Sequence, residues 1–269
     1  ASNDSLVEAK NNFAGLYFEE KNYEKAIKYY EEAIVDGCKV ALENLGDLYY
    51  QTKDYQKAIS YYLRNSTSVS CQKKLADIYM EAENTDEAII WYKKASESGD
   101  SNSSYKIAQI YMDLGYNEEA KKYFEIATSK NNINAYIYLG KLYFDEGKYE
   151  EAKRYFEIPA NDANTYSEHM LGLIYDIHYK EYDDAKYWYE KSRSKKCIES
   201  IYNLGLLNLR LKEYNEAEKY FKEGLRSDDS RCEYMLAWLY YKKSLDMYTS
   251  LGNKDYEDSK DILSKMPNL

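Results

Sequence analysis

The stretch Leu139-Gly140-Lys141-Leu142-Tyr143, followed by Tyr149-Glu150-Glu151-Ala152-Lys153-Arg154-Tyr155-Phe156, decides the fold because variants of it recur along the chain. We count from its small residue, Gly140, and call the equivalent residue of each copy the anchor. Successive anchors are 32, 30, 32, 32, 32, 33 and 32 residues apart. A fixed period in this range indicates a stacked repeat array. The anchors are Ala14, Gly46, Ala76, Ala108, Gly140, Gly172, Gly205 and Ala237.

Each copy is predicted to be a helical hairpin. Apolar and small residues lie at helical spacing around the anchor (helix A), and a second set follows after a short turn (helix B). Only two prolines and eleven glycines occur in 269 residues, which favours long helices over sandwiches or barrels. One hairpin cannot bury its apolar faces alone, so stability must come from contacts between neighbours. We therefore predict an all-α solenoid of about eight hairpins.

The boundaries follow from the repeat. Residues 1–4 are expected to be a disordered N-terminus, and Ser5-Leu6-Val7-Glu8 matches a capping box that would begin the first helix. Residues 5–230 hold seven repeats, and residues 231–269 a degenerate repeat and a capping helix. The helix after Ala237 is expected to end near Gly252, before a final amphipathic helix that carries Tyr256, Ile262, Leu263 and Met266.

Two irregularities carry their own predictions. Pro159 stands where helix B of the fifth repeat should continue, and because proline removes a helical hydrogen bond we expect an early end or a kink there. The interval of 30 contains Asn65-Ser66-Thr67-Ser68-Val69-Ser70, which we expect to form a tight turn.

The pattern Leu45-Gly46, Tyr49, Ala58 and Tyr62 resembles the tetratricopeptide repeat, and the resemblance spans roughly residues 5–225. Three departures are a period of mostly 32 rather than 34, the missing early tryptophan and the missing proline after helix B. The ends of helix B, such as residues 95–100, resemble the related Sel-like repeats instead. The resemblance implies a right-handed superhelix with a concave, ligand-facing surface.

Composition excludes several classes of function. The net charge of −10 and the pI of about 5.0 disfavour binding to phosphate backbones, so we expect no nucleic-acid partner. No apolar run approaches the ~18 residues needed to span a bilayer, so we expect no membrane insertion. We expect a cytoplasmic location. The chain does not begin with methionine, which leaves export after removal of a signal peptide open.

Catalytic and metal-binding patterns are missing from the sequence. His169 and His178 have no Cys, Asp or Glu neighbours at zinc-ligand spacing, and there is no phosphate-binding glycine loop or nucleophile motif. We therefore expect no cofactor, no metal and no enzymatic activity. The four cysteines form two equivalent couples, Cys38 with Cys71 and Cys197 with Cys232. These are either two inter-repeat disulfides or four thiols, and the sequence leaves both open.

The packing motif leaves one stripe of helix A free. At ~100° per residue, positions −3, +1, +4 and +5 from the anchor point away from positions −1, 0 and +3. We call these positions the stripe. It is acidic in the first half of the array and apolar or aromatic in the second. We predict that the stripe binds a partner through Glu43, Asp47, Lys73, Asp77, Tyr105, Gln109, Ile137, Lys141, His169, Leu173, Ile177, Tyr202, Leu206 and Leu209.

The predicted function is therefore a protein-interaction scaffold or adaptor. It would hold a peptide or partner segment with basic residues at the second and third repeats and an apolar part at the sixth and seventh. Burial of the apolar half by curvature or by the C-terminal helix is the competing explanation. The alternatives are the peptide-sensing region of a larger bacterial regulator, a self-associating scaffold such as a homodimer, and, least favoured, a repeat-based hydrolase.

Overall fold

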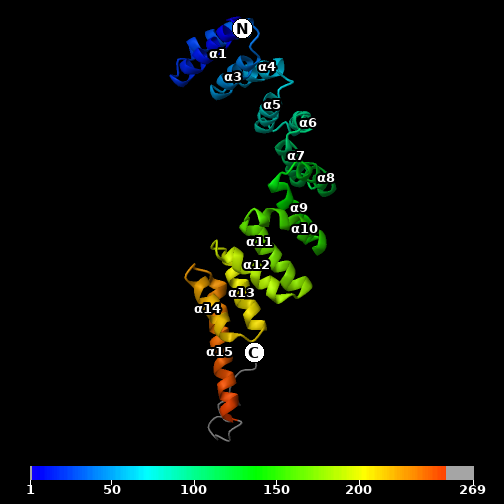
Figure 1. The fold of residues 1–269 in the computed structure, drawn as a ribbon, viewed down its shortest axis with the longest axis vertical. Coiled ribbons are helices and arrows are strands. Elements are labelled where there is room, and N and C mark those ends of the chain that lie inside the picture. Colours follow the sequence, from blue (N-terminus) through cyan, green and yellow to red (C-terminus); the bar gives the residue numbers. More distant parts are fainter. Residues whose placement is uncertain (1, 253–269) are drawn as a thin grey trace. The chain divides into compact units, whose positions relative to one another are not determined.

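The computed structural model describes residues 2–252, which form α-helices and one π-helical turn, η1, with no strand among them. The all-α prediction is confirmed (Figure 1). The elements are α1 (Ser2–Glu19), α2 (Tyr23–Val35), α3 (Lys39–Gln51), α4 (Tyr55–Arg64), α5 (Val69–Glu81), α6 (Thr85–Glu97), α7 (Ser101–Asp113), α8 (Asn117–Ser129), α9 (Ile133–Asp145), α10 (Tyr149–Asn161), α11 (Thr165–Ile174), η1 (Tyr175–Tyr179), α12 (Tyr182–Arg193), α13 (Ile198–Arg210), α14 (Tyr214–Leu225) and α15 (Ser230–Gly252).

The chain divides into two compact units, residues 1–135 and residues 136–269. In the first unit, helix B of each hairpin packs against helix A of the next, as α2 does on α3, α4 on α5 and α6 on α7. The second unit repeats this arrangement with α10 on α11, α12 on α13 and α14 on α15. Within each unit the hairpins are thus stacked as in a repeat solenoid, and each is stabilised by its neighbours in that unit.

The glycine anchors permit close contact between the two helices of a hairpin. A Cβ added to Gly205 would lie 2.3 Å from a ring carbon of Phe221, and one added to Gly46 would lie 2.4 Å from the ring of Tyr62. Gly140 has the same relation to Phe156, at 2.8 Å. Helix B therefore presents a large ring to the bare backbone of helix A, which explains why the repeat joins a small residue to an aromatic one.

Pairs of tyrosines on helix A and helix B add to this packing. A tyrosine three residues after the anchor stacks on a tyrosine fifteen residues after the same anchor. Their rings are near-parallel, with centroids 5.4–5.6 Å apart. Aromatic pairs in this geometry add to the energy of area burial alone. The pairs are Tyr17 with Tyr29, Tyr49 with Tyr61, Tyr111 with Tyr123, and Tyr143 with Tyr155.

The contact between successive hairpins uses a second set of positions on helix A. From the second repeat on, the residues five before and one before the anchor are buried, with at most 6% of their surface exposed. The first of these is always small, because helix B of the preceding hairpin comes close to it. Gly224 illustrates this approach, since a Cβ there would lie 2.3 Å from the sulfur of Cys232.

Most hairpin turns share one geometry, and the exception has a visible cause. Seven residues after the anchor the backbone is left-handed, as at Lys53, where the amide of Asp54 bonds to the carbonyl of Tyr49 and closes helix A. In the sixth repeat the left-handed residue is Lys180, eight after the anchor. The extra residue of the 33-residue interval is absorbed by η1, since a π-turn holds one residue more than an α-turn.

Other local predictions differ from the structure. The 30-residue interval shortens a helix rather than the turn predicted at residues 65–70: α4 has 10 residues where most helices have 13, and Val69 and Ser70 already belong to α5. The early end at Pro159 is wrong: α10 continues to Asn161 and also has 13 residues. Pro159 stands near the end of the helix, where few further backbone bonds depend on it. Helix α1 begins at Ser2 rather than at the capping box, so the box does not mark its start.

The C-terminal end of the described chain is α15, a single helix of 23 residues that runs to Gly252 as expected. The predicted final helix with Tyr256, Ile262, Leu263 and Met266 lies outside the described residues. The four cysteines are free thiols, of which Cys71 and Cys232 are buried. Among the described helices, none combines the length and the apolar character needed to cross a membrane.

Candidate protein-interaction surface

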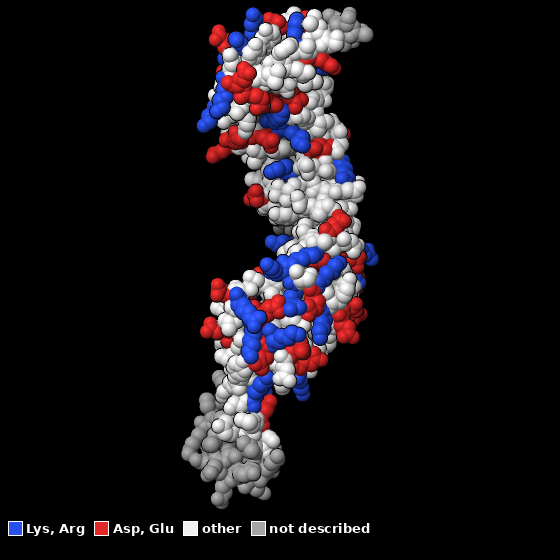
Figure 2. Space-filling model, turned by 60° about the vertical axis from the view of Figure 1, so that its left-hand side comes forward, with Lys and Arg blue, Asp and Glu red and all other residues white. Residues whose placement is uncertain are grey.

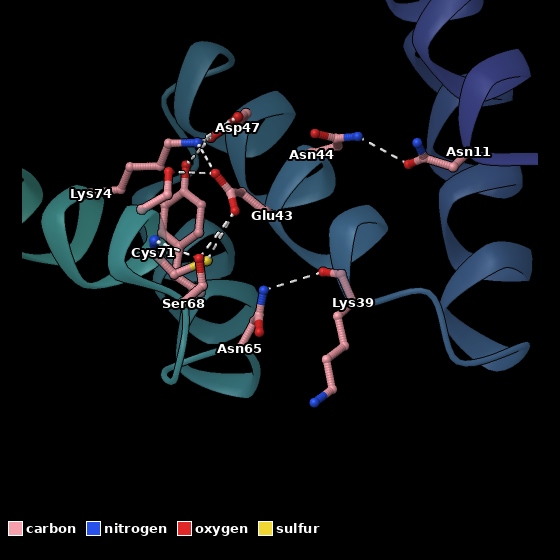
Figure 3. Close-up of polar contacts among 11 residues, drawn as sticks. Asn11, Lys39, Glu43, Asn44, Asp47, Asn65, Ser68, Cys71 and Lys74 are labelled. Carbon is pink, nitrogen blue, oxygen red and sulfur yellow. Dashed lines mark hydrogen bonds and ion pairs between the residues drawn. The ribbon is translucent and has the colours of Figure 1, made fainter. Parts of the chain in front are cut away.

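In the first unit, the acidic stripe residues Glu43 and Asp47 of α3 are bound by a lysine of the next repeat. Lys74 of α5 places its Nζ 2.9 Å from Glu43 Oε1 and 2.7 Å from the Asp47 carboxylate (Figure 3). Ser70 also donates a hydrogen bond of 2.5 Å to Glu43 Oε1. Burial disfavours the charge of Glu43, but the bonds from Ser70 and Lys74 outweigh it, and the pKa of this carboxyl is lowered.

Asp47 and Asp77 also accept hydrogen bonds from buried tyrosines of their own hairpins. Tyr62, which is 1% exposed, donates a hydrogen bond of 2.6 Å to Asp47 Oδ1, and Tyr92 donates one to Asp77. Burial and the carboxylate together raise the pKa of Tyr62. The acidic character of the stripe in these two repeats therefore has a structural cause, because a phenol at the glycine contact needs an acceptor on helix A.

A small pocket of about 120 Å³ nevertheless lies on the stripe between α3 and α5. Asp47 keeps 40% of its side chain exposed, and Asp77 is also exposed. Beside the pocket, Tyr50 donates a hydrogen bond to Glu81, which raises the pKa of Tyr50 to about 12. Figure 2 shows acidic side chains gathered with a few lysines over the N-terminal end of the first unit. The pocket is lined by Asp47, Tyr50, Tyr62, Lys74 and Asp77.

Two carboxylates, those of Glu43 and Asp47, bind Lys74 at this pocket. The Asp77 carboxylate also lines the pocket, and Glu81 adds negative charge beside it through its bond with Tyr50. A local excess of negative charge next to the tyrosine rings suits a cationic side chain, which gains from both carboxylates and aromatic faces. We call Asp47, Tyr50, Tyr62, Lys74 and Asp77 the acidic pocket.

The other predicted residues of the first unit contact neighbouring side chains. Lys73 pairs with Asp100 at 3.1 Å, at the turn that begins α7. Gln109 donates a hydrogen bond of 3.1 Å to the hydroxyl of Tyr105, and the ring of Tyr105 lies 5.8 Å from that of Phe124. These three residues are half-buried and do not line the acidic pocket.

In the second unit, the apolar stripe residues are largely covered by neighbouring repeats. Leu173 packs against two core clusters, one on each side of its hairpin. Tyr202, Leu206 and Leu209 of α13 pack against the core that includes Phe221. All four are half-buried. The competing explanation, burial by neighbouring helices, therefore accounts for much of the apolar half of the stripe.

Three further stripe residues of this unit remain accessible to different degrees. Ile177, within η1, is 43% exposed, Lys141 is exposed, and Ile137 is half-buried.

His169 contacts a buried serine: its Nδ1 lies 2.9 Å from the hydroxyl of Ser200. Burial lowers the pKa of His169. A serine and a histidine are in contact here, but Ser200 is completely buried between repeats, so this contact belongs to packing.

The residue that the stripe prediction missed is Lys74. It stands two residues before its anchor, outside the stripe positions, and reaches back to the preceding helix A.

One sequence signal could have revealed the role of the aspartates. The two hairpins with an aspartate directly after the anchor carry tyrosine sixteen residues after the anchor. The hairpins that carry Phe124, Phe156 and Phe221 at that position have Gln109, Lys141 and Leu206 directly after the anchor. Within the described residues, no group of three metal-binding side chains occurs.

Comparison with known proteins agrees with this architecture. Models of the tetratricopeptide repeat match residues 12–65, 74–98, 101–129, 133–157 and 198–231, together more than half of the chain. A comparison with curated proteins finds no match.

Several solved structures share the fold. The antigen c5321 of uropathogenic Escherichia coli, described as displaying an SLR fold, is 19% identical with a TM-score of 0.70 over 97% of this chain. The chain covers 64% of that structure, less than two thirds of its length. A Sel1 repeat protein from Oxalobacter formigenes is 14% identical, with a TM-score of 0.67 over 97% of this chain and 87% of that one. The C-terminal part of a repeat protein from Cytophaga hutchinsonii is 15% identical, with a TM-score of 0.63 over 82% and 97% of the two chains.

At these identities the structural likeness establishes the fold alone. Repeat folds of this kind are generally protein-interaction scaffolds and are typically non-catalytic. The repeat matches cover more than half of the chain and agree with the spacing of the anchors, so the chain belongs to the tetratricopeptide repeat family.

Proposed function

We propose that the protein is a non-catalytic adaptor that binds a partner segment through the acidic pocket, with a lysine or arginine of that segment placed between Asp47 and Asp77. The observation that carries the proposal is the excess of carboxylates around Lys74 at a pocket walled by Tyr50 and Tyr62. This retains the predicted basic contact at the second and third repeats. It does not use the apolar half of the stripe, because neighbouring repeats cover much of it.

The pocket suits one side chain rather than a small-molecule substrate. Its volume of about 120 Å³ is well below the several hundred Å³ typical of ligand sites. A long cationic side chain could place its charge near the Asp77 carboxylate and its methylene groups against the ring of Tyr50. Remaining contacts would come from the backbone and neighbouring side chains of the bound segment, giving moderate and reversible binding.

The test is selection of peptides from a randomised 12-residue library on the wild-type chain, followed by calorimetry of the enriched peptides. We expect enrichment of Lys or Arg and an affinity that falls as salt increases. The double variant Asp47→Asn with Asp77→Asn should weaken binding at least tenfold, about 1.4 kcal/mol. Asparagine retains an oxygen that can accept the bonds from Tyr62 and Tyr92, so the hairpins should remain folded.

A matched control removes the same charge elsewhere. Asp86→Asn with Glu97→Gln changes two exposed carboxylates of α6 and should leave the affinity within twofold of wild type. Selected peptides without basic residues, or equal binding to wild type and to the pocket variant, would refute the proposed site. A loss of binding common to both double variants would indicate that only the overall charge matters.

A further inference from the structure

The outer face of α1 carries the apolar residues of a repeat interface, yet no neighbouring helix among the described residues covers it. Phe13 and Leu16 lie one before and two after the anchor Ala14. Their equivalents in the second repeat, Leu45 and Leu48, are at most 1% exposed, whereas Phe13 is 54% and Leu16 is 60% exposed. Phe13 touches Tyr29, with ring centroids 6.3 Å apart, and more than half of it remains accessible.

These residues continue into a seam along the helix. Leu6, 56% exposed, and the half-buried Ala9 precede Phe13 and Leu16 at successive spacings of three, four and three residues. This spacing places all four on one narrow face and matches the apolar positions of a coiled coil. A helix face that met only water would be expected to carry polar residues here. We call Leu6, Ala9, Phe13 and Leu16 the α1 seam.

The backbone before the seam differs from that of most later repeats. Nine residues before the anchor those repeats have a left-handed turn residue, such as Gly37 or Gly99, which joins the preceding helix B. The corresponding residue of the first repeat is Ser5, and it is helical because α1 begins at Ser2. Helix α1 therefore continues through this position, so Leu6 and Ala9 lie on the same helix as Phe13 and Leu16.

We infer that the α1 seam pairs with the same seam of a second copy of this chain, with the two helices antiparallel about a twofold axis. In this register Ala9 lies opposite Phe13 of the other copy, and Leu6 lies opposite Leu16. A small residue thus faces the largest one and two leucines face each other, so the seam is complementary to itself, as a twofold interface requires. The interface also continues the set of positions by which the repeats of each chain already pack.

The charges beside the seam do not oppose this pairing. Lys10, next to Ala9, forms an ion pair of 2.6 Å with Asp36 of α2's C-terminal turn, so its charge is balanced within its own chain. Asn12, on the other side of the seam, is uncharged and would lie near its own copy across the twofold axis. The net charge of −10 on each chain still produces long-range repulsion. Added salt should screen this repulsion and strengthen the dimer.

This salt dependence separates the pairing from the proposed function. Binding of a basic segment in the acidic pocket should weaken with salt, whereas pairing of α1 seams should strengthen. The two surfaces also share no residue. Failure of either proposal is therefore distinguishable from failure of the other.

The experiment is sedimentation equilibrium of the full chain at 10–300 μM and at two salt concentrations. We expect a reversible dimer with a dissociation constant of roughly 10–100 μM, as is typical of small interfaces. Phe13→Glu with Leu16→Glu should weaken association more than tenfold with helicity unchanged. The control Val35→Glu with Val40→Glu changes exposed apolar residues at another turn and should leave the dimer intact. A monomer throughout, or a dimer unaffected by the seam variant, would overturn the inference.

Cross-linking checks the orientation independently of stability. Asn12→Cys should form a disulfide with its own copy under mild oxidation, identified by mass spectrometry of the linked peptide. In the antiparallel register Ser5 and its copy are about 12 residues apart along the helices, or about 18 Å at 1.5 Å per residue. Ser5→Cys should therefore not link, whereas efficient linking of Ser5→Cys would indicate parallel helices and contradict the proposed pairing.

Discussion

The phenol of Tyr62 on α4 donates a hydrogen bond of 2.6 Å to the carboxylate of Asp47 on α3, directly over the glycine contact of the second repeat. The two residues are 15 positions apart and belong to one hairpin. Tyr92 and Asp77 repeat the relationship in the third hairpin. Where phenylalanine takes the tyrosine position, no aspartate follows the anchor. The pairing is particular to these two hairpins, because Gly15 and Leu173 follow the anchors in the hairpins that contain Tyr30 and Tyr189.

This hydrogen bond predicts that removing its donor and removing its acceptor lower the free energy of unfolding by different amounts. Tyr62→Phe removes the donor and leaves Asp47 bound to Lys74, so the free energy of unfolding should fall by about 0.5–1.5 kcal/mol. Asp47→Leu leaves the phenol of Tyr62 buried without its acceptor and should cost about 1–3 kcal/mol. The double variant, which recreates the Leu206 and Phe221 combination, should cost less than the sum. Urea unfolding of all four chains measures the coupling, and strict additivity would contradict the assigned bond.

The glycine anchors predict that adding a single methyl group, by replacing glycine with alanine, strongly destabilises the protein. Gly205→Ala places a Cβ 2.3 Å from the ring of Phe221, and overpacking of this kind should destabilise the protein by about 1–3 kcal/mol. Gly15→Ala is the matched control, because its Cβ would approach only the Tyr30 hydroxyl, at 3.8 Å. Alanine is the better helix former, so this variant should gain about 0.5–1 kcal/mol. Equal denaturation midpoints for the two variants would show that the anchor contact is not tight.

Glu168 of α11 is completely buried, and its charge is balanced by Lys191 of α12 in the same hairpin and by Lys195 in the turn after α12. Lys195 Nζ lies 2.7 Å from both carboxylate oxygens, and Lys191 lies 3.5 Å from one of them. Lys195→Met should therefore destabilise strongly, toward the 3–5 kcal/mol expected for an uncompensated buried charge, reduced by the remaining Lys191. Glu168→Leu with Lys195→Met should recover most of that loss. Chemical denaturation checks this, and a double variant no more stable than the single one would be inconsistent with it.

The cysteines are expected to react in two classes. Burial raises the pKa of the Cys71 and Cys232 thiols to about 11, whereas Cys38 and Cys197 are partly exposed. At pH 8 a disulfide reagent should modify Cys38 and Cys197 quickly and the buried pair slowly, because the thiolate is the reactive form. Unfolding in urea without reductant should make all four react. Fewer than four thiols in urea would support the inter-repeat disulfides that the sequence leaves open.

The sequence by itself determined the repeat, because period and residue size are local properties. The anchors at Gly46 and Gly205 and the aromatic residues sixteen positions later define each hairpin. The 30-residue interval predicted a tight turn, whereas the structure shortens α4 instead. The extra residue of the 33-residue interval was visible, but its place in η1 was not, since several positions of the hairpin could have accommodated it. The end predicted at Pro159 was wrong because the proline stands near the end of α10, where few further backbone hydrogen bonds depend on it.

What only the tertiary structure decided is how much of the predicted stripe remains available. Its positions were inferred from the geometry of one helix, and that geometry cannot show that Lys74 reaches from the following repeat to Glu43 and Asp47. Nor can it show that Leu173 and Leu206 are half covered by their neighbours. The physical reason is that periodicity identifies the face of a helix, whereas burial and ion pairing depend on residues some 30 positions away, which approach only when the hairpins stack.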